Sequence, residues 1–373
     1  MRENELEMIP ETTETSEVLA PETGTPVADD VLLDVRNLKK HFVVAKSFFG
    51  KPIKWLKAVD NVSFTLKKGK TLGIVGESGC GKTTMGRTVL KLHQPTAGQI
   101  IFEGKDITNY TPKQMRALRT KMQIVFQDPY SSLPPRSTVG DILSEPVKVH
   151  GIVPPSEVKD YVLEIMEQCG LRDYYYERYP HEFSGGQRQR ICIARALAVK
   201  PKFIVCDECV SALDVSIQSQ IINLLEELKE KENLTYLFIS HDLSVVRYIS
   251  DRIGVMYLGN MVEMGTAEEV FSDPRHPYTV ALLSSIPTTD MNALKKERII
   301  LEGNIPSPIR PPEGCKFHTR CYMACDKCKR VPPPYVEVTP GHHVACHFLD
   351  KKVDENGKYL FDLPETAKAT ERK

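Results

Sequence analysis

The chain has 373 residues, which suggests two or three domains at roughly 100–200 residues per domain. Hydrophobic residues make up 41% and charged residues 26%, and 49 basic residues balance 49 acidic ones, so nothing in the charge favours nucleic acid or an anionic membrane surface. No apolar run approaches the roughly 18 residues of a membrane-spanning helix, and the acidic N-terminus does not resemble a signal peptide. We therefore expect a cytoplasmic protein that does not span a bilayer.

The first 30 residues carry nine acidic residues and one basic residue, and they are rich in Thr, Pro and Glu. Such a segment cannot bury enough apolar surface to fold, so residues 1–30 are expected to form a disordered acidic tail. From residue 31 to about 265, short apolar runs alternate with helical patterns. Eight runs predict strands: 31–35, 62–66, 72–75, 99–102, 122–126, 203–206, 236–239 and 253–258.

Helical patterns separate these runs. An apolar stripe along residues 217–231 predicts an amphipathic helix, and residues 138–149 and 156–169 predict two helices in a region without strand signals. Strands separated by helices indicate an α/β fold with parallel pairing. We predict such a domain over residues 31–270, with a helical insertion at about 136–190.

After about residue 271 the character of the sequence changes. Residues 276–286 have a helical pattern, and the proline-rich segment 305–312 interrupts regular structure. Five cysteines follow between Cys315 and Cys346. We predict an extension over residues 271–350 and a charged, frayed tail over residues 351–373.

A phosphate-binding motif follows the predicted strand 72–75. It matches the G-x-x-x-x-G-K-[ST] pattern between a strand and a helix, where backbone N–H groups surround a phosphate at the positive end of the helix. Lys82 can reach the β- and γ-phosphates, and the Thr83 hydroxyl can bind Mg²⁺. A glycine-rich turn without function does not account for the full pattern in this setting. The predicted nucleotide-binding residues are Gly76, Glu77, Ser78, Gly79, Cys80, Gly81, Lys82, Thr83 and Thr84.

Two acidic residues end the hydrophobic run 203–206. Asp207 fits the acid that holds Mg²⁺ in P-loop ATPases, and Glu208 fits a general base that faces the attacking water. Many strands end in acidic residues, so this pair gains its meaning from the phosphate-binding motif upstream.

A second phosphate-facing helix start is predicted at Ser184, Gly185, Gly186 and Gln187. Ser184 can cap a helix that runs to Leu197 and offer its hydroxyl to a phosphate, and the glycines allow close approach of the backbone. One nucleotide does not need two such sites from one subunit. The pair of sites therefore suggests that two subunits share a nucleotide.

Together these motifs resemble those of the ATPase subunits of ABC transporters, with residues 184–187 as the signature motif. Four more positions match the family: Gln127 the Q-loop, Asp214 the end of the D-loop, His241 the switch histidine, and Phe42 the aromatic that stacks on adenine. A surface polar role for Gln127 and a core role for His241 are disfavoured by this order of motifs. The resemblance implies a P-loop NTPase (RecA-like) ABC ATPase core with an antiparallel β subdomain and a helical insertion.

The resemblance also implies cofactors and roles. ATP and Mg²⁺ would lie between Lys82 and Thr83 of one subunit and residues 184–187 of another, in a head-to-tail dimer. Gln127 would sense Mg²⁺ and the γ-phosphate, and His241 would hold the γ-phosphate and the water near Glu208.

Four segments are similar to oligopeptide and dipeptide importer ATPases in particular: 40–42, 126–133, 181–184 and 276–279. The insertion between His41 and Ala58 resembles the F-type subunit, which implies a D-type sibling ATPase, two membrane permease subunits and an extracytoplasmic peptide-binding protein, with this chain at the cytoplasmic face of the membrane. Pro134 and Cys209 replace the usual Asn and Pro of the family. Importers of nickel complexes or glycans, and less favourably non-transport ABC ATPases, are the alternatives.

The cysteines near the C-terminus have the spacing of metal ligands. Cys315, Cys321, Cys328 and Cys346 suit Zn²⁺ or a [4Fe–4S] cluster, and the Cys325-x2-Cys328 pair with nearby histidines suits zinc. Reduced thiols that only pack the extension are the structural alternative. The family resemblance favours a structural iron–sulfur cluster, with Cys325 outside it.

Overall fold

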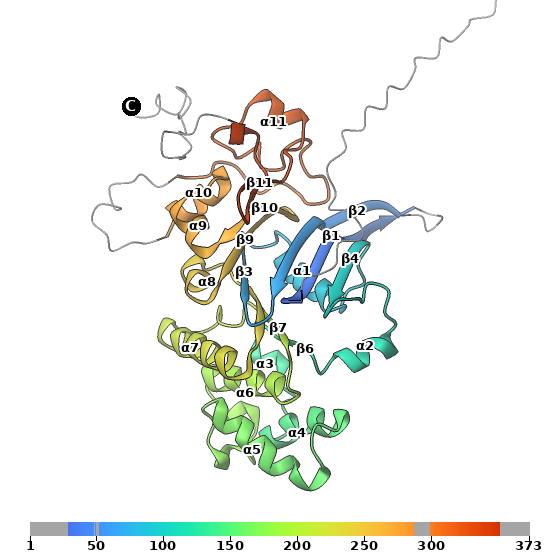
Figure 1. The fold of residues 1–373 in the computed structure, drawn as a ribbon, viewed down its shortest axis with the longest axis vertical. Coiled ribbons are helices and arrows are strands. Elements are labelled where there is room, and N and C mark those ends of the chain that lie inside the picture. Colours follow the sequence, from blue (N-terminus) through green and yellow to red (C-terminus); the bar gives the residue numbers. More distant parts are fainter. Residues whose placement is uncertain (1–28, 48, 50–51, 287–298, 351–373) are drawn as a thin grey trace, which may run out of the picture.

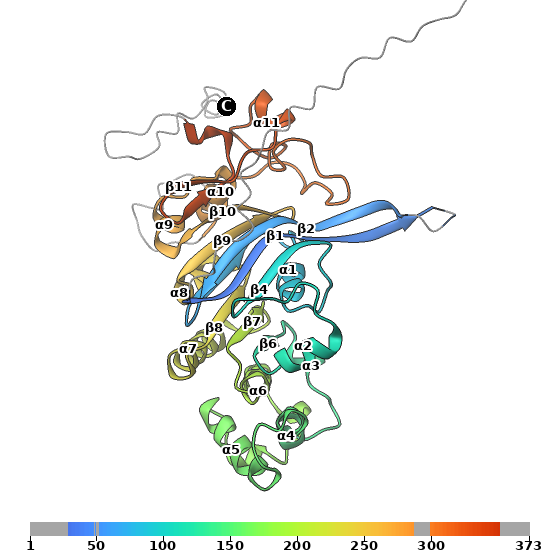
Figure 2. The same ribbon diagram turned by 45° about the vertical axis from the view of Figure 1, so that its right-hand side comes forward.

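The computed structural model describes residues 29–47, 49, 52–286 and 299–350. The tail predicted for residues 351–373 lies outside the described residues, as does the tail 1–30 except for its last two positions. Figures 1 and 2 show helices at one end of the long axis, two sheets in the middle and residues 299–350 at the other end. In the part that the structure describes, no helix is long and apolar enough to cross a bilayer.

The larger sheet has eight strands in the order β11-β12-β10-β9-β3-β8-β7-β6. Its last five strands in this order are parallel. They are β9 (Arg252–Tyr257), β3 (Thr71–Val75), β8 (Thr235–Ile239), β7 (Phe203–Asp207) and β6 (Met122–Val125). The structure thus confirms strands at the five predicted runs between residues 72 and 258 that belong to this sheet.

Successive residues of the parallel strands enter two different cores. In β7, Phe203 and Val205 pack toward the smaller sheet, whereas Ile204 and Cys206 pack toward the helices on the opposite face. Because both faces are covered, the strands carry uninterrupted apolar runs instead of alternating ones. One side is covered by α1 (Lys82–Val89), and the other by α6 (Gly185–Leu197), α7 (Val215–Glu232) and α8 (Leu243–Ile249).

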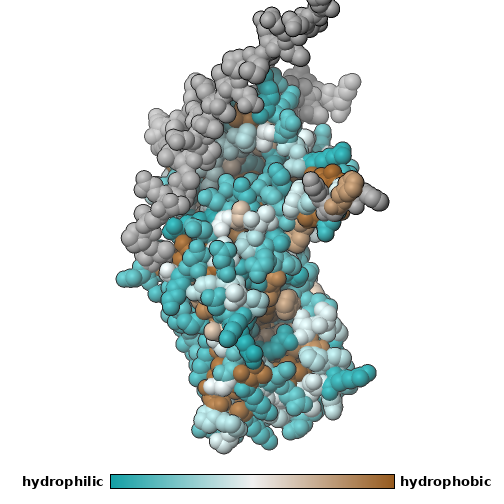
Figure 3. All heavy atoms as spheres, turned by 90° about the vertical axis from the view of Figure 1, so that its right-hand side faces the viewer, coloured by the Kyte–Doolittle hydropathy of each residue, from teal (hydrophilic) through white to brown (hydrophobic). Residues whose placement is uncertain are grey.

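The smaller sheet is antiparallel, in the order β2-β1-β4-β5. A long hairpin of β1 (Val31–Lys46) and β2 (Pro52–Lys67) protrudes from the body, and β4 (Ala97–Phe102) and β5 (Lys105–Asp106) complete the sheet (Figure 2). The predicted strands 31–35 and 62–66 are only its inner ends, since backbone pairing extends the ladder through polar residues. Val43, Val44, Ile53 and Trp55 of this hairpin are exposed, and Figure 3 shows scattered hydrophobic patches on a largely hydrophilic surface.

A group of helices lies at the end of the molecule below the sheets. The predicted helices 138–149 and 156–169 are α4 (Val139–His150) and α5 (Val158–Gln168), which pack on α6. Thr138 and Asp141 form a capping box at the start of α4, which explains why the helix begins there. The shorter elements of this half are α2 (Pro112–Leu118), α3 (Pro129–Ser132), η1 (Pro155–Glu157), η2 (Asp173–Tyr175) and η3 (Pro180–Glu182).

The C-terminal region, described over residues 267–286 and 299–350, continues the larger sheet. Its strand β12 (His342–Val344) pairs antiparallel with β10 (Asn260–Thr266), and β11 (Val336–Thr339) follows at the edge. No strand had been predicted beyond residue 258, because the buried Glu263 interrupts the apolar pattern of β10. Helices of this region are α9 (Ala267–Ser272), α10 (Pro277–Ser284), α11 (Asp326–Arg330) and the short η5 (His347–Asp350).

Candidate functional site

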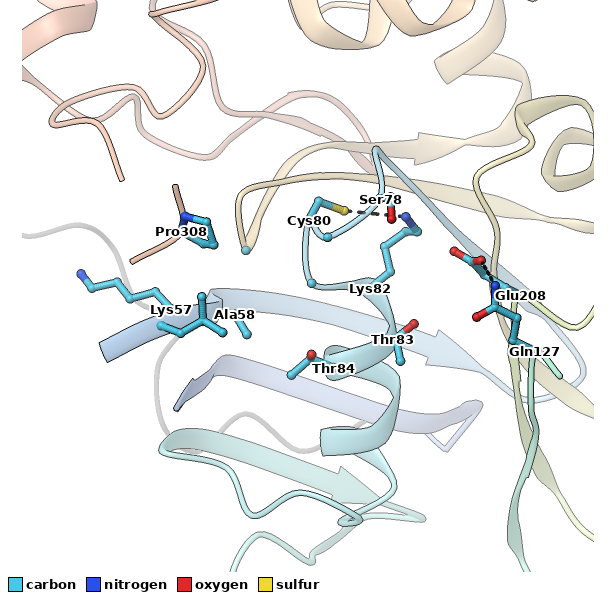
Figure 4. A pocket seen from close by; sticks show the side chains of 14 residues that line it. Lys57, Ala58, Ser78, Cys80, Lys82, Thr83, Thr84, Gln127, Glu208 and Pro308 are labelled. Carbon is cyan, nitrogen blue, oxygen red and sulfur yellow. Dashed lines mark hydrogen bonds between the residues drawn. The ribbon is translucent and has the colours of Figure 1, made fainter. Parts of the chain in front are cut away.

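A cavity of about 310 Å³ opens beside the start of α1 (Figure 4). Figure 4 shows Gln127 and Glu208 on one side of Lys82, and Lys57 and Pro308 on the other. Among the described residues, the predicted ones that line the cavity are Ser78, Gly79, Cys80, Gly81, Lys82, Thr83, Thr84, Gln127 and Glu208. Three separate motifs of the sequence therefore meet at one cavity.

Glycine shapes the loop between β3 and α1. Gly81, just before α1, has a φ of 110°, and a Cβ atom there would lie 2.0 Å from the carbonyl oxygen of Ala58. The helix begins without a side-chain cap, and residues of its first turn line the cavity. The positive end of α1 is thus left for an anion, as a phosphate-binding loop requires.

Lys82 lies inside this loop with 4% of its surface exposed. Its Nζ donates to the carbonyl oxygens of Gly76 at 2.6 Å and Glu77 at 3.2 Å. Gly76 and Glu77 themselves are not among the residues that line the cavity. The ammonium group is therefore held at the cavity wall by carbonyl groups of the loop.

Asp207 lies behind Thr83, at the end of β7. The Thr83 hydroxyl donates to Asp207 Oδ1 at 2.7 Å, and Arg87 Nη2 lies 3.4 Å from Asp207 Oδ2. Burial raises the pKa of Asp207, and the contacts with Thr83 and Arg87 oppose that rise. Adjacent hydroxyl and carboxylate oxygens are the ligands that Mg²⁺ prefers, so these two residues fit the ion.

Glu208 meets two side chains that come from other strand ends. Gln127 Nε2 donates to Glu208 Oε2 at 2.9 Å, and His241 Nδ1 lies 3.6 Å from the same oxygen. The three residues follow β6, β7 and β8, and parallel neighbours end at the same edge of a sheet. Glu208 has a φ of 51°, uncommon for a residue with a side chain, and its N–H donates to Ile239 O at 2.9 Å.

The structure does not bring the remaining predicted residues to this cavity. Phe42 packs edge-on against His93, with ring centroids 5.5 Å apart, and Lys40 Nζ lies 4.7 Å from the centre of its ring. Across the β1–β2 ladder, Leu56 pairs with Phe42 and lines the cavity in its place. Asp214 is exposed and precedes α7.

The predicted second phosphate site begins α6, away from the cavity. Ser184 and Gln187 form a capping box in which Ser184 Oγ accepts from the Gln187 N–H at 3.4 Å. Ser184 is exposed, and Gly185 and Gly186 are half-buried. None of these four is among the described residues that line the cavity, as expected if they serve a nucleotide on another subunit.

Five lining residues had not been predicted. They are Leu56, Lys57, Ala58, Gly259 and Pro308. Gly259 stands at the turn from β9 to β10, and the carbonyl of Pro308 accepts from the Lys57 N–H at 3.3 Å. The proline-rich segment had been predicted only as a break in regular structure, and no local pattern indicates that it reaches the cavity.

The cysteines predicted to bind metal come together in the C-terminal region. Burial, and then the nearby thiols of Cys346, Cys315 and Cys328, raise the pKa of Cys321 to about 12. The Sγ atoms of Cys325 and Cys328 are 3.5 Å apart. Within the described residues, however, no three Cys, His, Asp or Glu side chains are arranged to hold a metal ion.

The sequence matches two families over most of its folded length. The ABC transporter family matches residues 59–211, and the oligopeptide/dipeptide transporter C-terminal region matches residues 262–328. The oligopeptide transport ATP-binding protein AppF of Bacillus subtilis is 54% identical over 325 residues, which are 87% of this chain and 99% of AppF. The chain belongs to the ATP-binding proteins of oligopeptide and dipeptide ABC transporters.

Other members and solved structures agree with this assignment. The dipeptide transport ATP-binding protein DppF of Haemophilus influenzae is 49% identical, over 86% of this chain and 97% of DppF. The dimeric structure of MJ0796, a bacterial ABC transporter cassette, has a TM-score of 0.56 at 26% identity and covers 63% of this chain and 99% of its own. The fold is therefore that of an ABC ATPase, as the motifs predicted.

Proposed function

We propose that this ABC ATPase hydrolyses ATP to power the import of di- and oligopeptides through separate membrane permease subunits. The meeting of Gln127, Glu208 and His241 beside the phosphate-binding loop is the observation that supports catalysis. The peptide substrate rests on the names of the relatives, which are oligopeptide and dipeptide transport proteins.

ATP fits the cavity through its phosphates. The uncapped start of α1 and the Lys82 ammonium would hold them, and Thr83 with Asp207 would hold Mg²⁺. Bound there, Mg²⁺ would neutralise charge on the β- and γ-phosphates. To contact a phosphate, Lys82 Nζ would exchange the carbonyl oxygens of Gly76 and Glu77 for phosphate oxygens.

Glu208 is the proposed general base. Its carboxylate accepts the proton of the attacking water at Oε2, the atom that Gln127 and His241 approach. Gln127 orients the carboxylate through its amide N–H and would report the state of the γ-phosphate to the rest of the molecule. His241 would hold the water and the γ-phosphate in line with Glu208.

We also propose that residues 184–187 complete the ATP site of a second ATPase subunit, a D-type sibling, in a head-to-tail dimer with Asp214 at its interface. The exposure of Ser184 supports that arrangement, as does the fact that none of the four residues lines this chain's own cavity. Two permease subunits and a peptide-binding protein outside the membrane would complete the importer, with this chain at the cytoplasmic face and no nucleic acid as a partner.

We propose the same domain boundaries that the sequence predicts. An ABC ATPase domain would cover residues 31–270, with a helical subdomain at about 136–190, and a Cys-rich extension would cover residues 271–350. The pairing of β10 with β12 joins the extension to the ATPase domain through one sheet.

For the cysteines, we propose an iron–sulfur cluster on Cys315, Cys321, Cys328 and Cys346, with zinc as the alternative. Four thiolates around one Zn²⁺ lie about 3.8 Å apart, given Zn–S bonds of about 2.3 Å in a tetrahedron. The thiols of Cys315, Cys321, Cys328 and Cys346 influence one another, and four cysteines are the ligand set of a [4Fe–4S] cluster. Anaerobic purification should give a coloured protein that contains iron. A colourless protein with stoichiometric zinc would refute the cluster.

Co-purification from native membranes in a mild detergent tests the transport function. The tagged chain should bring down two hydrophobic permeases and a second, similar ATPase. Ribosomal or other soluble partners without a permease would leave the ATPase assignment intact and contradict the transport assignment.

A further inference from the structure

Glu77, the second residue of the phosphate-binding loop, is held from outside the loop at two points. Arg320 Nη1 lies 2.7 Å from Glu77 Oε2, and Arg320 Nη2 lies 3.0 Å from Glu77 Oε1. The backbone N–H of Glu77 donates to the Tyr278 hydroxyl at 2.9 Å. Both partners belong to the C-terminal region, more than 200 residues along the chain.

These two partners are rigidly placed. The Arg320 side chain is 7% exposed, and Tyr278 is fully buried. The Tyr278 ring packs against Tyr257 and Phe317, with centroids 4.8 and 5.3 Å away. A planar guanidinium that makes two parallel contacts with a carboxylate fixes direction as well as distance, which a single lysine contact does not.

The C-terminal region also contacts the residues next to the cavity-lining segments of β2 and the turn at Gly259. Lys316 Nζ donates to Asp60 Oδ2 and to the Leu258 carbonyl, both at 3.1 Å, and thereby ties β2 to the turn at Gly259. Its pKa is lowered by burial, while Asp60 opposes the fall. Lys316 and Arg320 lie between Cys315 and Cys321, so one short segment reaches both the loop and the hairpin.

We propose that Arg320 and Tyr278 position the phosphate-binding loop, so that the C-terminal region is part of the nucleotide-binding machinery. Neither residue lines the cavity, so both act through Glu77. The loop is then fixed at Glu77 as well as at α1 before ATP arrives. Such pre-organisation strengthens binding because less order must be created when the nucleotide binds. This inference rests on the proposed binding of ATP.

Calorimetric titration of the full-length protein with MgATP tests the proposal. Arg320→Met and Tyr278→Phe should each weaken ATP binding roughly ten-fold, since small displacements of binding groups are costly. KM for ATP should rise while kcat changes less than about two-fold, because Glu208 and its partners lie at other strand ends. Arg330→Met, an exposed arginine of the same region, is the matched control and should bind ATP as the wild type does.

A double-mutant cycle separates this role from general stability. Glu77→Gln combined with Arg320→Met should weaken ATP binding about as much as the stronger single change. Each of the two changes removes the same Arg320–Glu77 contact, so their effects should not add. Arg320→Lys should restore part of the affinity. Should Arg320→Met not fold, Tyr278→Phe, which removes one oxygen atom, decides the matter.

The outcomes distinguish the two proposals. ATP affinity unchanged in folded Arg320→Met and Tyr278→Phe variants, beside a wild type that binds MgATP, would overturn the positioning role alone. A wild-type chain that binds no MgATP would overturn the proposed function instead.

Discussion

Glu208 occupies a left-handed backbone conformation at the end of β7, and this conformation decides where its carboxylate points. Its N–H is bonded to β8 and its side chain to Gln127, so both ends of the residue are fixed. If β7 continued as an extended strand, the side chain of residue 208 would lie on the sheet face opposite to that of Asp207. The turn instead places the carboxylate at the cavity, next to His241.

Changing Glu208 to Gln should therefore abolish turnover and spare binding. The amide keeps the size of the side chain but cannot accept the water proton, so kcat should fall by about 100-fold or more. The Kd for MgATP should stay within about two-fold. Phosphate release and calorimetry measure the two quantities, with Glu230→Gln on the exposed face of α7 as the control. Turnover at the wild-type rate would remove Glu208 from the role of base.

At the scale of single residues, nine of the fourteen residues that line the candidate site belong to motifs read from the sequence. Lys82, Asp207 and Glu208 carry their chemistry in local patterns, and the structure places them together. Phe42 and Arg320 show the limit of such patterns. Whether Phe42 faces the cavity depends on the pairing register of β1, and the contact of Arg320 with Glu77 joins residues 243 positions apart.

Helix α10 begins at a histidine that must be neutral. His276 Nδ1 accepts from the N–H of Tyr278 at 3.1 Å, and the ring is 1% exposed beside Phe317. Burial lowers the pKa of His276 to about 4 from its ordinary value near 6.5, and the carboxylate of Glu263 only partly opposes this. A protonated imidazole would lose the acceptor that caps the helix.

The free energy of unfolding should consequently fall as the pH drops from about 6.5 toward 4. In that range His276 is protonated in the unfolded chain and stays neutral in the folded chain. His276 alone should lower the unfolding free energy by about 2 kcal/mol between pH 7 and pH 5. Urea unfolding at both pH values measures the effect, and His276→Asn, which caps without titrating, should show a smaller pH dependence. Equal pH dependence in both proteins would contradict this origin.

At the scale of elements, buried helices and parallel strands were predictable, and paired edges were not. The runs at 203–206 and 236–239 are apolar on both faces because both faces are covered. Residues 41–46 of β1, residues 52–58 of β2, and β10 form strands for a different reason, since their order comes from the partner strand. Backbone pairing between distant strands leaves no signal in the hydrophobic pattern of the sequence.

At the scale of the whole molecule, the exposed start of α6 is the surface that a second subunit would meet. A Cβ atom on Gly185 would touch only Leu213 Cδ2, at an ordinary 3.5 Å, so a side chain fits there within the monomer. A negative charge at the first position of a helix is favourable for that helix. The same charge would repel a triphosphate brought by another subunit.

Gly185→Glu should thus leave the monomer folded, with its own MgATP affinity within about two-fold, and prevent ATP-dependent association. Light scattering after gel filtration measures association with the co-purified sibling ATPase, in a Glu208→Gln background that keeps ATP intact. The control is Gln220→Glu, which adds the same charge at an exposed position of α7. Undiminished association of Gly185→Glu would refute a shared site at residues 184–187.

The pairing of β10 with β12 has a consequence for how this kind of chain can be shortened or recombined. A cassette ending after α9 would expose the N–H and C=O groups of β10, an open edge that invites aggregation. It would also deprive the Glu263 carboxylate of His342, whose Nε2 lies 2.8 Å away. Removing the C-terminal region would therefore cost the ATPase domain the backbone pairing of β12 at the edge of its larger sheet.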